Sequence, residues 1–156
     1  MEVQGLNALL TKLERVSKDA SSVLEKGMRK ACLAVEGDAK KNCPVDTGGL
    51  RASINHDVKV EGKTIIGVVG TNMEHGPYIE FGTGPKAAAN PNESAQHVGA
   101  HFRNTPWAYR NPKTDEVIWT HGYVGQPFLF PALKKNQQEI PKILANEIIK
   151  SIGGQS

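Results

Sequence analysis

One stretch near the N-terminus decides the fold class: residues 6–42 read LNALLTKLERVSKDASSVLEKGMRKACLAVEGDAKKN. Its apolar side chains recur at the three- and four-residue spacing of a helix, and lysines and arginines occupy the opposite face. Pro44 disfavours helical geometry at the residue before it. We therefore predict one long amphipathic helix over residues 6–42, either continuous or divided near Ser21. The apolar stripe consists of Leu6, Leu9, Leu10, Leu13, Val16, Ala20, Leu24, Gly27, Ala31 and Val35.

One position of this apolar stripe, Gly27, is a glycine inside the predicted helix. A glycine inside a helix costs about 1 kcal/mol of stability relative to alanine. We therefore expect another element to pack very close to the helix at Gly27.

After residue 52 the period changes from that of a helix to that of a strand. Apolar and polar residues alternate over residues 54–60, which predicts a half-buried strand. Gly62 supplies the positive φ of a tight hairpin turn. The apolar run over residues 64–70 predicts a second strand that is covered on both faces, either inside the sheet or by a neighbouring subunit. A further short strand is predicted over residues 78–82.

The second half of the chain is less regular. Residues 83–106 hold no sustained apolar period, and a loop of that length usually binds a partner or orders on assembly. Segments 107–110 and 117–120 predict a second hairpin. A last helix is predicted over residues 131–151, with Pro131 in its first turn and a kink at Pro141, because proline lacks the N–H group that the helix needs.

These elements predict an α+β fold, with a long N-terminal helix and a C-terminal helix packed on a mostly antiparallel β-sheet. The chain has 156 residues, which suits one domain over residues 1–156. Within it we expect the N-terminal helix, then a sheet core over residues 52–82. A variable insertion over residues 83–122, carrying a long loop and a protruding hairpin, would precede the C-terminal helix.

Composition excludes some classes of protein and leaves others open. No apolar run approaches the ~20 residues that span a bilayer, and the N-terminal segment lacks the pattern of a signal peptide. Cys32 and Cys43 are expected to be ordinary buried thiols of a reducing compartment. The net charge of +3 permits an anionic partner without requiring one, and the basic residues are interleaved with acids as on a solvated helix face.

The tripeptide Asp46-Thr47-Gly48 is also the catalytic tripeptide of retroviral-type aspartic proteases, in which two such aspartates share a proton across a dimer. Here it follows a long helix and a proline rather than an apolar strand, which argues against that chemistry. The structural interpretation is that Asp46 or Thr47 caps a short turn over Gly48–Ala52.

Other candidate sites have structural interpretations too. His97 and His101 have a metal-ligand spacing only if the segment is helical, and Gly99 weakens that helix. Glu80 lies in an apolar setting, where an ion pair with Arg51 is a more natural use than catalysis.

Phe128 belongs to the aromatic segment before the last helix. It closes the core in one interpretation and anchors a subunit contact in the other.

Three segments, taken in order, resemble the signature of a bacteriophage tail-component family. They are CPVDTGGLRASI at residues 43–54, YIEFGT at residues 78–83 and GQPFLFPAL at residues 125–133. With the flanking helices they extend the resemblance over about residues 6–150, whereas residues 84–122 have no counterpart. The family is the gene-product-ten-like neck or tail-completion proteins of HK-type long-tailed phages and prophages. The motif residues carried over from it are Pro44, Asp46, Thr47, Gly48, Leu50, Arg51, Ser53, Tyr78, Glu80, Phe81, Gly82, Thr83, Pro127, Phe128, Leu129, Pro131, Ala132 and Leu133.

The resemblance implies a virion structural protein of the head–tail junction, without enzymatic activity or cofactor. Such a protein would assemble as a ring with copies of itself, and it would lie in the host cytoplasm during assembly and in the virion afterwards. Its other partners would be head-closure or connector proteins and tail-terminator or tail-tube proteins. Loop 83–106 and hairpin 107–120 would then reach the adjacent subunit or the next ring. A further hypothesis is non-specific contact of the lumen with passing DNA, through charge and not base reading. Two alternatives stay open: a small aspartyl-protease-like or metal-dependent enzyme, and a nucleic-acid-binding module.

Overall fold

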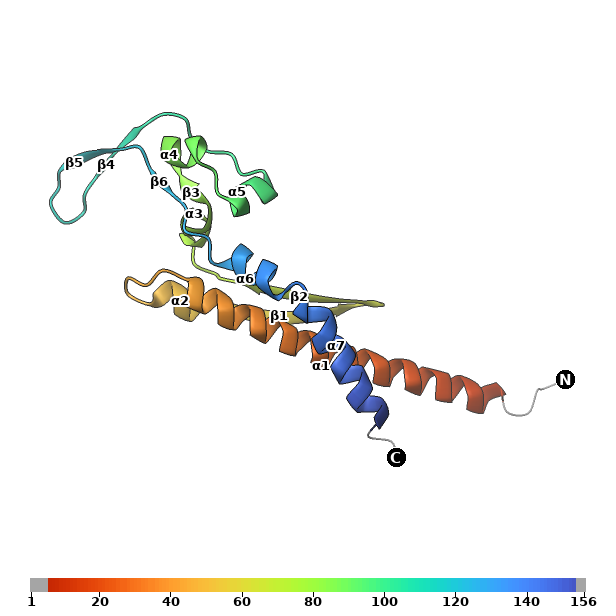
Figure 1. The fold of residues 1–156 in the computed structure, drawn as a ribbon. Helices are drawn as coiled ribbons and strands as arrows, with labels where there is room; N and C mark the ends of the chain where they lie inside the picture. Colours follow the sequence, from red (N-terminus) through yellow and green to blue (C-terminus); the bar gives the residue numbers. More distant parts are fainter. Residues whose placement is uncertain (1–5, 154–156) are drawn as a thin grey trace. The chain divides into compact units, whose positions relative to one another are not determined.

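The computed structural model describes residues 6–153, and the side chains of residues 19–151. Helices stand at both ends of the chain with small antiparallel sheets between them, which confirms the α+β class (Figure 1). The elements are α1 (Leu6–Asn42), α2 (Gly49–Ser53), β1 (Asn55–Glu61), β2 (Thr64–Gly70), α3 (Gly76–Phe81), β3 (Gly82–Thr83), α4 (Gly84–Ala89), α5 (Glu93–Val98), β4 (Trp107–Arg110), β5 (Val117–Thr120), β6 (Tyr123–Val124), α6 (Leu129–Asn136) and α7 (Glu139–Gly153).

The strands do not form the single sheet that the sequence predicts. Within the described residues they make three two-stranded sheets, β1–β2, β3–β6 and β4–β5. The chain forms two compact units, and each is described by itself. Unit 1 comprises Met1–Ala34, His56–Val69 and Asn136–Ser156, and unit 2 comprises Val35–Asn55 and Gly70–Lys135.

Helix α1 spans Leu6–Asn42 without a break, which confirms the predicted helix in its continuous form. In unit 1, helix α7 packs against it at Gly27. A Cβ atom added to Gly27 would lie 2.9 Å from Cδ2 of Leu144 and 3.4 Å from its Cα. The close approach predicted at Gly27 is therefore confirmed.

The β1–β2 hairpin packs one face on the same helix. Val58 is buried, and a Cβ atom on Gly67 would lie 2.4 Å from Sγ of Cys32. On the other face, Ile66 and Val68 keep 39% and 48% of their surface exposed. Strand β2 is thus not covered on both faces by strands of its own chain, and a covering subunit stays a prediction.

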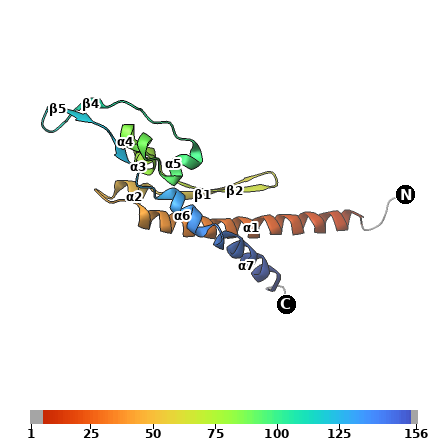
Figure 2. The ribbon, with the colours of Figure 1, turned by 45° about the horizontal axis from the view of Figure 1, so that its top comes forward.

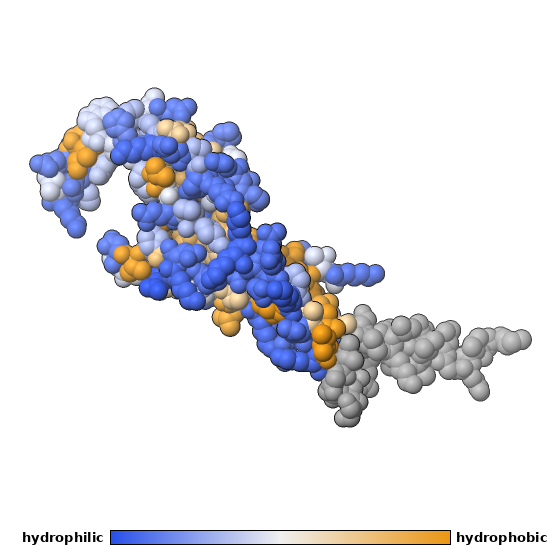
Figure 3. Space-filling view, viewed as in Figure 1, coloured by the Kyte–Doolittle hydropathy of each residue, from blue (hydrophilic) through white to orange (hydrophobic). Residues whose placement is uncertain are grey.

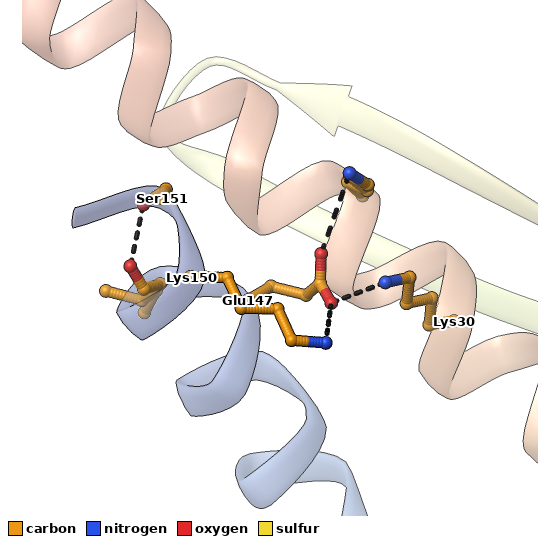
Figure 4. Close-up of polar contacts among 6 residues, drawn as sticks. Lys30, Glu147, Lys150 and Ser151 are labelled. Atoms are coloured by element: carbon orange, nitrogen blue, oxygen red, sulfur yellow. Dashed lines mark hydrogen bonds and ion pairs between the residues drawn. The ribbon is translucent and has the colours of Figure 1, made fainter. Parts of the chain in front are cut away.

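A charge cluster also joins α1 to α7 (Figure 4). The carboxylate of Glu147, with a side chain 7% exposed, accepts a 2.5 Å hydrogen bond from Nζ of Lys30. The ammonium groups of Lys26 and Lys150 lie 3.9 Å and 3.8 Å from its oxygens. The hydrogen bond from Lys30, together with the three positive charges, lowers the pKa of Glu147 against the opposing effect of burial.

In unit 2, residues 78–81 are helical, so the predicted strand there is wrong. Pro77 stands in the first turn of α3, where its fixed φ favours a helix and its missing N–H costs nothing. Gly82 ends the helix with a φ of +90°. Only Gly82 and Thr83 are extended, and they pair with β6 as strand β3.

The segment 83–106 is also more ordered than predicted. It forms α4, which has Pro85 in its first turn, and α5, which begins after Asn92. Residues 99–106 remain irregular. The hairpin that follows is confirmed: β4 and β5 pair antiparallel from Trp107 opposite Thr120 to Arg110 opposite Val117.

The predicted C-terminal helix is divided into α6 and α7. The break falls at residues 137–138, so that Pro141 lies in the first turn of α7 rather than in a helix interior. Proline is tolerated there because the N–H groups of a first turn have no intrahelical partner. Of the helices within residues 6–153, none has the length and apolarity that crossing a membrane requires.

Candidate functional site: the motif residues around Glu80

Glu80 is the centre of the site, because its buried carboxylate caps a helix that lies far along the chain. It sits in the last turn of α3 with only 3% of its surface exposed. Backbone N–H groups at the start of α6 and one hydroxyl group all donate to it. The donors are Ser94 Oγ at 2.6 Å, Phe128 N at 2.7 Å, Leu129 N at 2.9 Å and Phe130 N at 3.1 Å.

The cap is complete because Pro131, the residue after the three donors, has no N–H group that needs an acceptor. The N–H groups of a first helical turn have no partner inside the helix. Three of those of α6 bond to Glu80, and Pro131 carries none. A carboxylate at a helix N-terminus also interacts favourably with the helix dipole. The second and third sequence motifs therefore meet in one contact.

The predicted ion pair between Glu80 and Arg51 is wrong. The oxygens of Glu80 are taken by backbone N–H groups and by the hydroxyl group of Ser94. Arg51 is exposed on α2. The anion in this apolar setting is thus satisfied by dipoles rather than by a counter-charge.

Asn92 ties α5 to the same centre. Its Oδ1 accepts a 2.8 Å hydrogen bond from the N–H of Ala95 and so caps α5, while its Nδ2 donates to the backbone oxygen of Glu80 at 2.8 Å. Sequence reasoning missed both Asn92 and Ser94. The available signal was an asparagine directly before a glutamate and a helical run, a typical N-cap pattern.

Glycines allow the backbones of β3 and β6 and their flanking residues to approach closely in the antiparallel pair. A Cβ atom on Gly82 would lie 2.5 Å from the backbone nitrogen of Gly125, and one on Gly122 would lie 1.9 Å from the carbonyl oxygen of Thr83. Gly82 and Gly122 also have positive φ values of 90° and 73°. The glycine and threonine of the second motif therefore form strand β3, which pairs closely with β6.

The third motif supplies part of the core. Phe128 and Ala132 are fully buried, which confirms the core interpretation of Phe128. Leu129 and Pro131 are half-buried, and Leu133 stays 50% exposed on α6.

The first motif forms a turn and a short helix, α2. Gly48, at a φ of +84°, is the N-cap residue and no side chain caps the helix, so the predicted cap by Asp46 or Thr47 is wrong. Both of those side chains are exposed. Leu50 is buried, and Ser53 Oγ donates to the carbonyl oxygen of Leu50 at 2.8 Å.

The histidine pair is not a helical pair. Helix α5 ends at Val98, and Gly99 leaves it with a left-handed φ of 64°. His97 lies on the helix with its ring centroid 4.9 Å from that of Phe130, whereas His101 lies beyond the helix. Between residues 6 and 153, no group of three or more His, Cys, Asp or Glu residues could hold a metal ion.

Both cysteines are free and buried, as predicted. Burial raises the pKa of the Cys32 thiol against the effect of Arg29, and it raises the pKa of Cys43 against the effect of Arg51. A raised pKa disfavours the thiolate, which is the reactive form. Neither thiol is therefore set up as a nucleophile.

The comparisons with known proteins agree with the predicted resemblance over the first half of the chain. Residues 7–82 match the model of the family described as "Bacteriophage HK97-gp10, putative tail-component". The match contains the first motif and ends within the second, so the third motif lies outside it. No curated protein and no solved structure matches the chain. Over the matched residues the chain is thus similar to a phage tail component, a structural class of protein.

Proposed function

We propose that this chain, whose residues 7–82 match a phage tail-component family, is a virion protein of the head–tail junction. In this proposal it assembles as a ring of identical subunits that joins tail to head, with head-closure and tail-terminator or tail-tube proteins as axial neighbours. The observation that carries the proposal is the use of Glu80, the one buried acid of the motifs. Its carboxylate caps a helix, and its oxygens are occupied by backbone N–H groups and the Ser94 hydroxyl group.

Glu80 also connects the matched residues to a part of the chain outside the match. Glu80 lies inside the match, whereas Phe128 and Leu129, which it binds, lie outside. The third motif is therefore part of the same structural centre as the second. This supports one structural module that includes α3 and the start of α6.

Exposed apolar residues support association with other proteins. On unit 2, Trp119 is 71% exposed and Val117 is 60% exposed, and on unit 1 the outer face of β2 carries Ile66 and Val68. Figure 3 shows hydrophobic atoms at the surface in the region of β4 and β5. Exposed apolar patches are typical of surfaces where proteins associate.

A phage genome that carries this gene provides the test. Deleting the gene should leave filled heads and separate tails, because the two parts would lack the component that joins them. A copy supplied in trans should restore joined particles, and antibody labelling should place the chain at the junction. Joined, infectious particles made without the chain would refute the proposal.

A further inference from the structure

On unit 1, lysines from two helices gather around one buried glutamate. Lys26 and Lys30 lie one turn apart on α1, and Lys150 comes from α7, which crosses α1 partway along its length (Figures 1, 2 and 4). We infer that Lys26 and Lys150 bind the phosphate backbone of the DNA that passes through the head–tail junction. The inference rests on the proposed function and deepens it by naming a contact with DNA and the residues that make it.

The cluster carries an excess of positive charge. Elsewhere on the surface, Lys134 pairs with Glu93 and Lys142 with Glu139, one cation to one acid. Around Glu147 three ammonium groups share a single carboxylate. Along α1 alone the basic residues alternate with acids, so the excess appears only when the fold brings in the lysine of α7.

Two of the three ammonium groups keep their hydrogen-bond donors free. Lys30 donates to the glutamate at 2.5 Å, whereas the nitrogens of Lys26 and Lys150 lie 3.9 Å and 3.8 Å from its oxygens, beyond hydrogen-bond length. Their side chains are 70% and 73% exposed. Among the residues whose side chains the structure describes, neither ammonium group has a hydrogen-bond acceptor. Each carries three donors, which can serve the oxygens of a bound anion.

Glu147 makes this arrangement possible. Like charges at such short range repel one another, and a carboxylate between them offsets that repulsion. Its side chain is only 7% exposed, so it remains beneath the ammonium groups rather than competing for a ligand at the surface. The buried acid thus holds cations together without cancelling their charge.

The chemistry of the cluster suits a phosphate backbone. A lysine contacts phosphate as a point charge, and such contacts carry no information about base sequence. Two contacts from one chain bind weakly, but the copies in a ring would add theirs along the same DNA. Weak, sequence-independent contacts allow the DNA to slide, as transfer of a genome through a junction requires.

An NMR titration of the full chain with a short random-sequence DNA duplex at low salt tests the site. The largest shifts should fall on the signals of Lys26 and Lys150 and on the neighbouring amides of α1 and α7. The ammonium signal of Lys134, which pairs with Glu93 on unit 2, should move little. Absence of shifts, or larger shifts at Lys134, would overturn the inference. Tighter binding of polyglutamate than of DNA at the same lysines would also overturn it, in favour of an acidic protein partner.

A matched pair of double variants measures the number of phosphate contacts. Lys26→Gln with Lys150→Gln should lower the slope of log K against log salt concentration by about 1.8, since each lost contact contributes about 0.9. Lys134→Gln with Lys142→Gln removes the same net charge from one-to-one pairs and should change the slope little. Both double variants keep the bond from Lys30 to Glu147, and unfolding in urea verifies that they fold. Equal slopes for the two would overturn the inference.

These outcomes separate the inference from the proposed function. Unchanged DNA binding by the Lys26→Gln, Lys150→Gln chain would overturn the DNA contact and leave the junction role intact. A chain missing from joined particles would refute the junction role instead, whatever the purified chain binds.

Discussion

The Oε2 atom of Glu80 lies 2.7 Å from the backbone nitrogen of Phe128, 48 residues further along the chain. The contact joins the end of one short helix to the start of another, and both ends carry residues of the tail-component motifs. A carboxylate in this position is a structural cap. Its removal should therefore be measured as lost stability and not as lost catalysis.

Glu80→Ala should lower the free energy of unfolding by about 3 kcal/mol or more, because it leaves buried N–H groups without acceptors. Glu80→Gln, which keeps one oxygen, should lose less. Denaturation in urea measures both. As a control, Glu93→Gln removes an exposed ion pair with Lys134 and should cost about 1 kcal/mol or less. Equal stability of Glu80→Ala and the natural chain would contradict the cap.

Phe128→Ala should destabilise the chain by about 3–5 kcal/mol, because the ring is fully buried and its removal leaves a cavity. Leu133→Ala, on the helix α6 that follows Phe128 but 50% exposed, is the matched control and should cost much less. Thermal unfolding followed by circular dichroism compares the two. A folded Phe128→Ala monomer with unchanged stability would contradict this core role.

Two glycine substitutions should change stability in opposite directions. Gly37→Ala should stabilise α1 by up to about 1 kcal/mol, since no atom lies within 4 Å of the added Cβ. Gly67→Ala should destabilise by about 1–3 kcal/mol, since its Cβ would meet Sγ of Cys32 at 2.4 Å. Unfolding in urea gives both values, and a neutral Gly67→Ala would show that β2 does not pack so closely on α1.

The contact between α1 and α7 should weaken in acid. Because the pKa of Glu147 in the folded chain is lowered below its usual value of 4.5, its carboxylate stabilises the fold fully above that usual value. This stabilisation is lost as the pH falls through the lowered pKa, where the carboxylate takes up a proton. Comparing unfolding at pH 7 and at successively lower pH should show a smaller pH dependence for Glu147→Gln. An identical pH dependence in the two chains would exclude this role.

The long helix could be predicted because ten apolar residues kept one period over most of its length. The strand predicted over residues 78–82 was wrong because a short segment with Tyr, Ile and Phe has no decisive period, and Pro77 and Gly82 fix its ends instead. Three two-stranded sheets could not be foreseen, since pairing depends on contacts distant in sequence.

The partner of Glu80 could not be predicted for a different reason. Its acceptor oxygens bind mainly backbone N–H groups, which every residue except proline has and which therefore leave no mark in the sequence. The prediction named Arg51 as the partner of Glu80, because a positively charged side chain can be recognised in a sequence. Pro131, the residue without an N–H group, was the available sign that a cap lay nearby.

The measurement that tests the central claim most directly is an electron cryo-microscopy reconstruction of the head–tail junction of particles that carry this chain. The account predicts a ring of identical copies between head and tail, each with Glu80 buried against α6. A junction without these copies, or a free monomer with a ligand turning over at Asp46 or at the histidines, would contradict it.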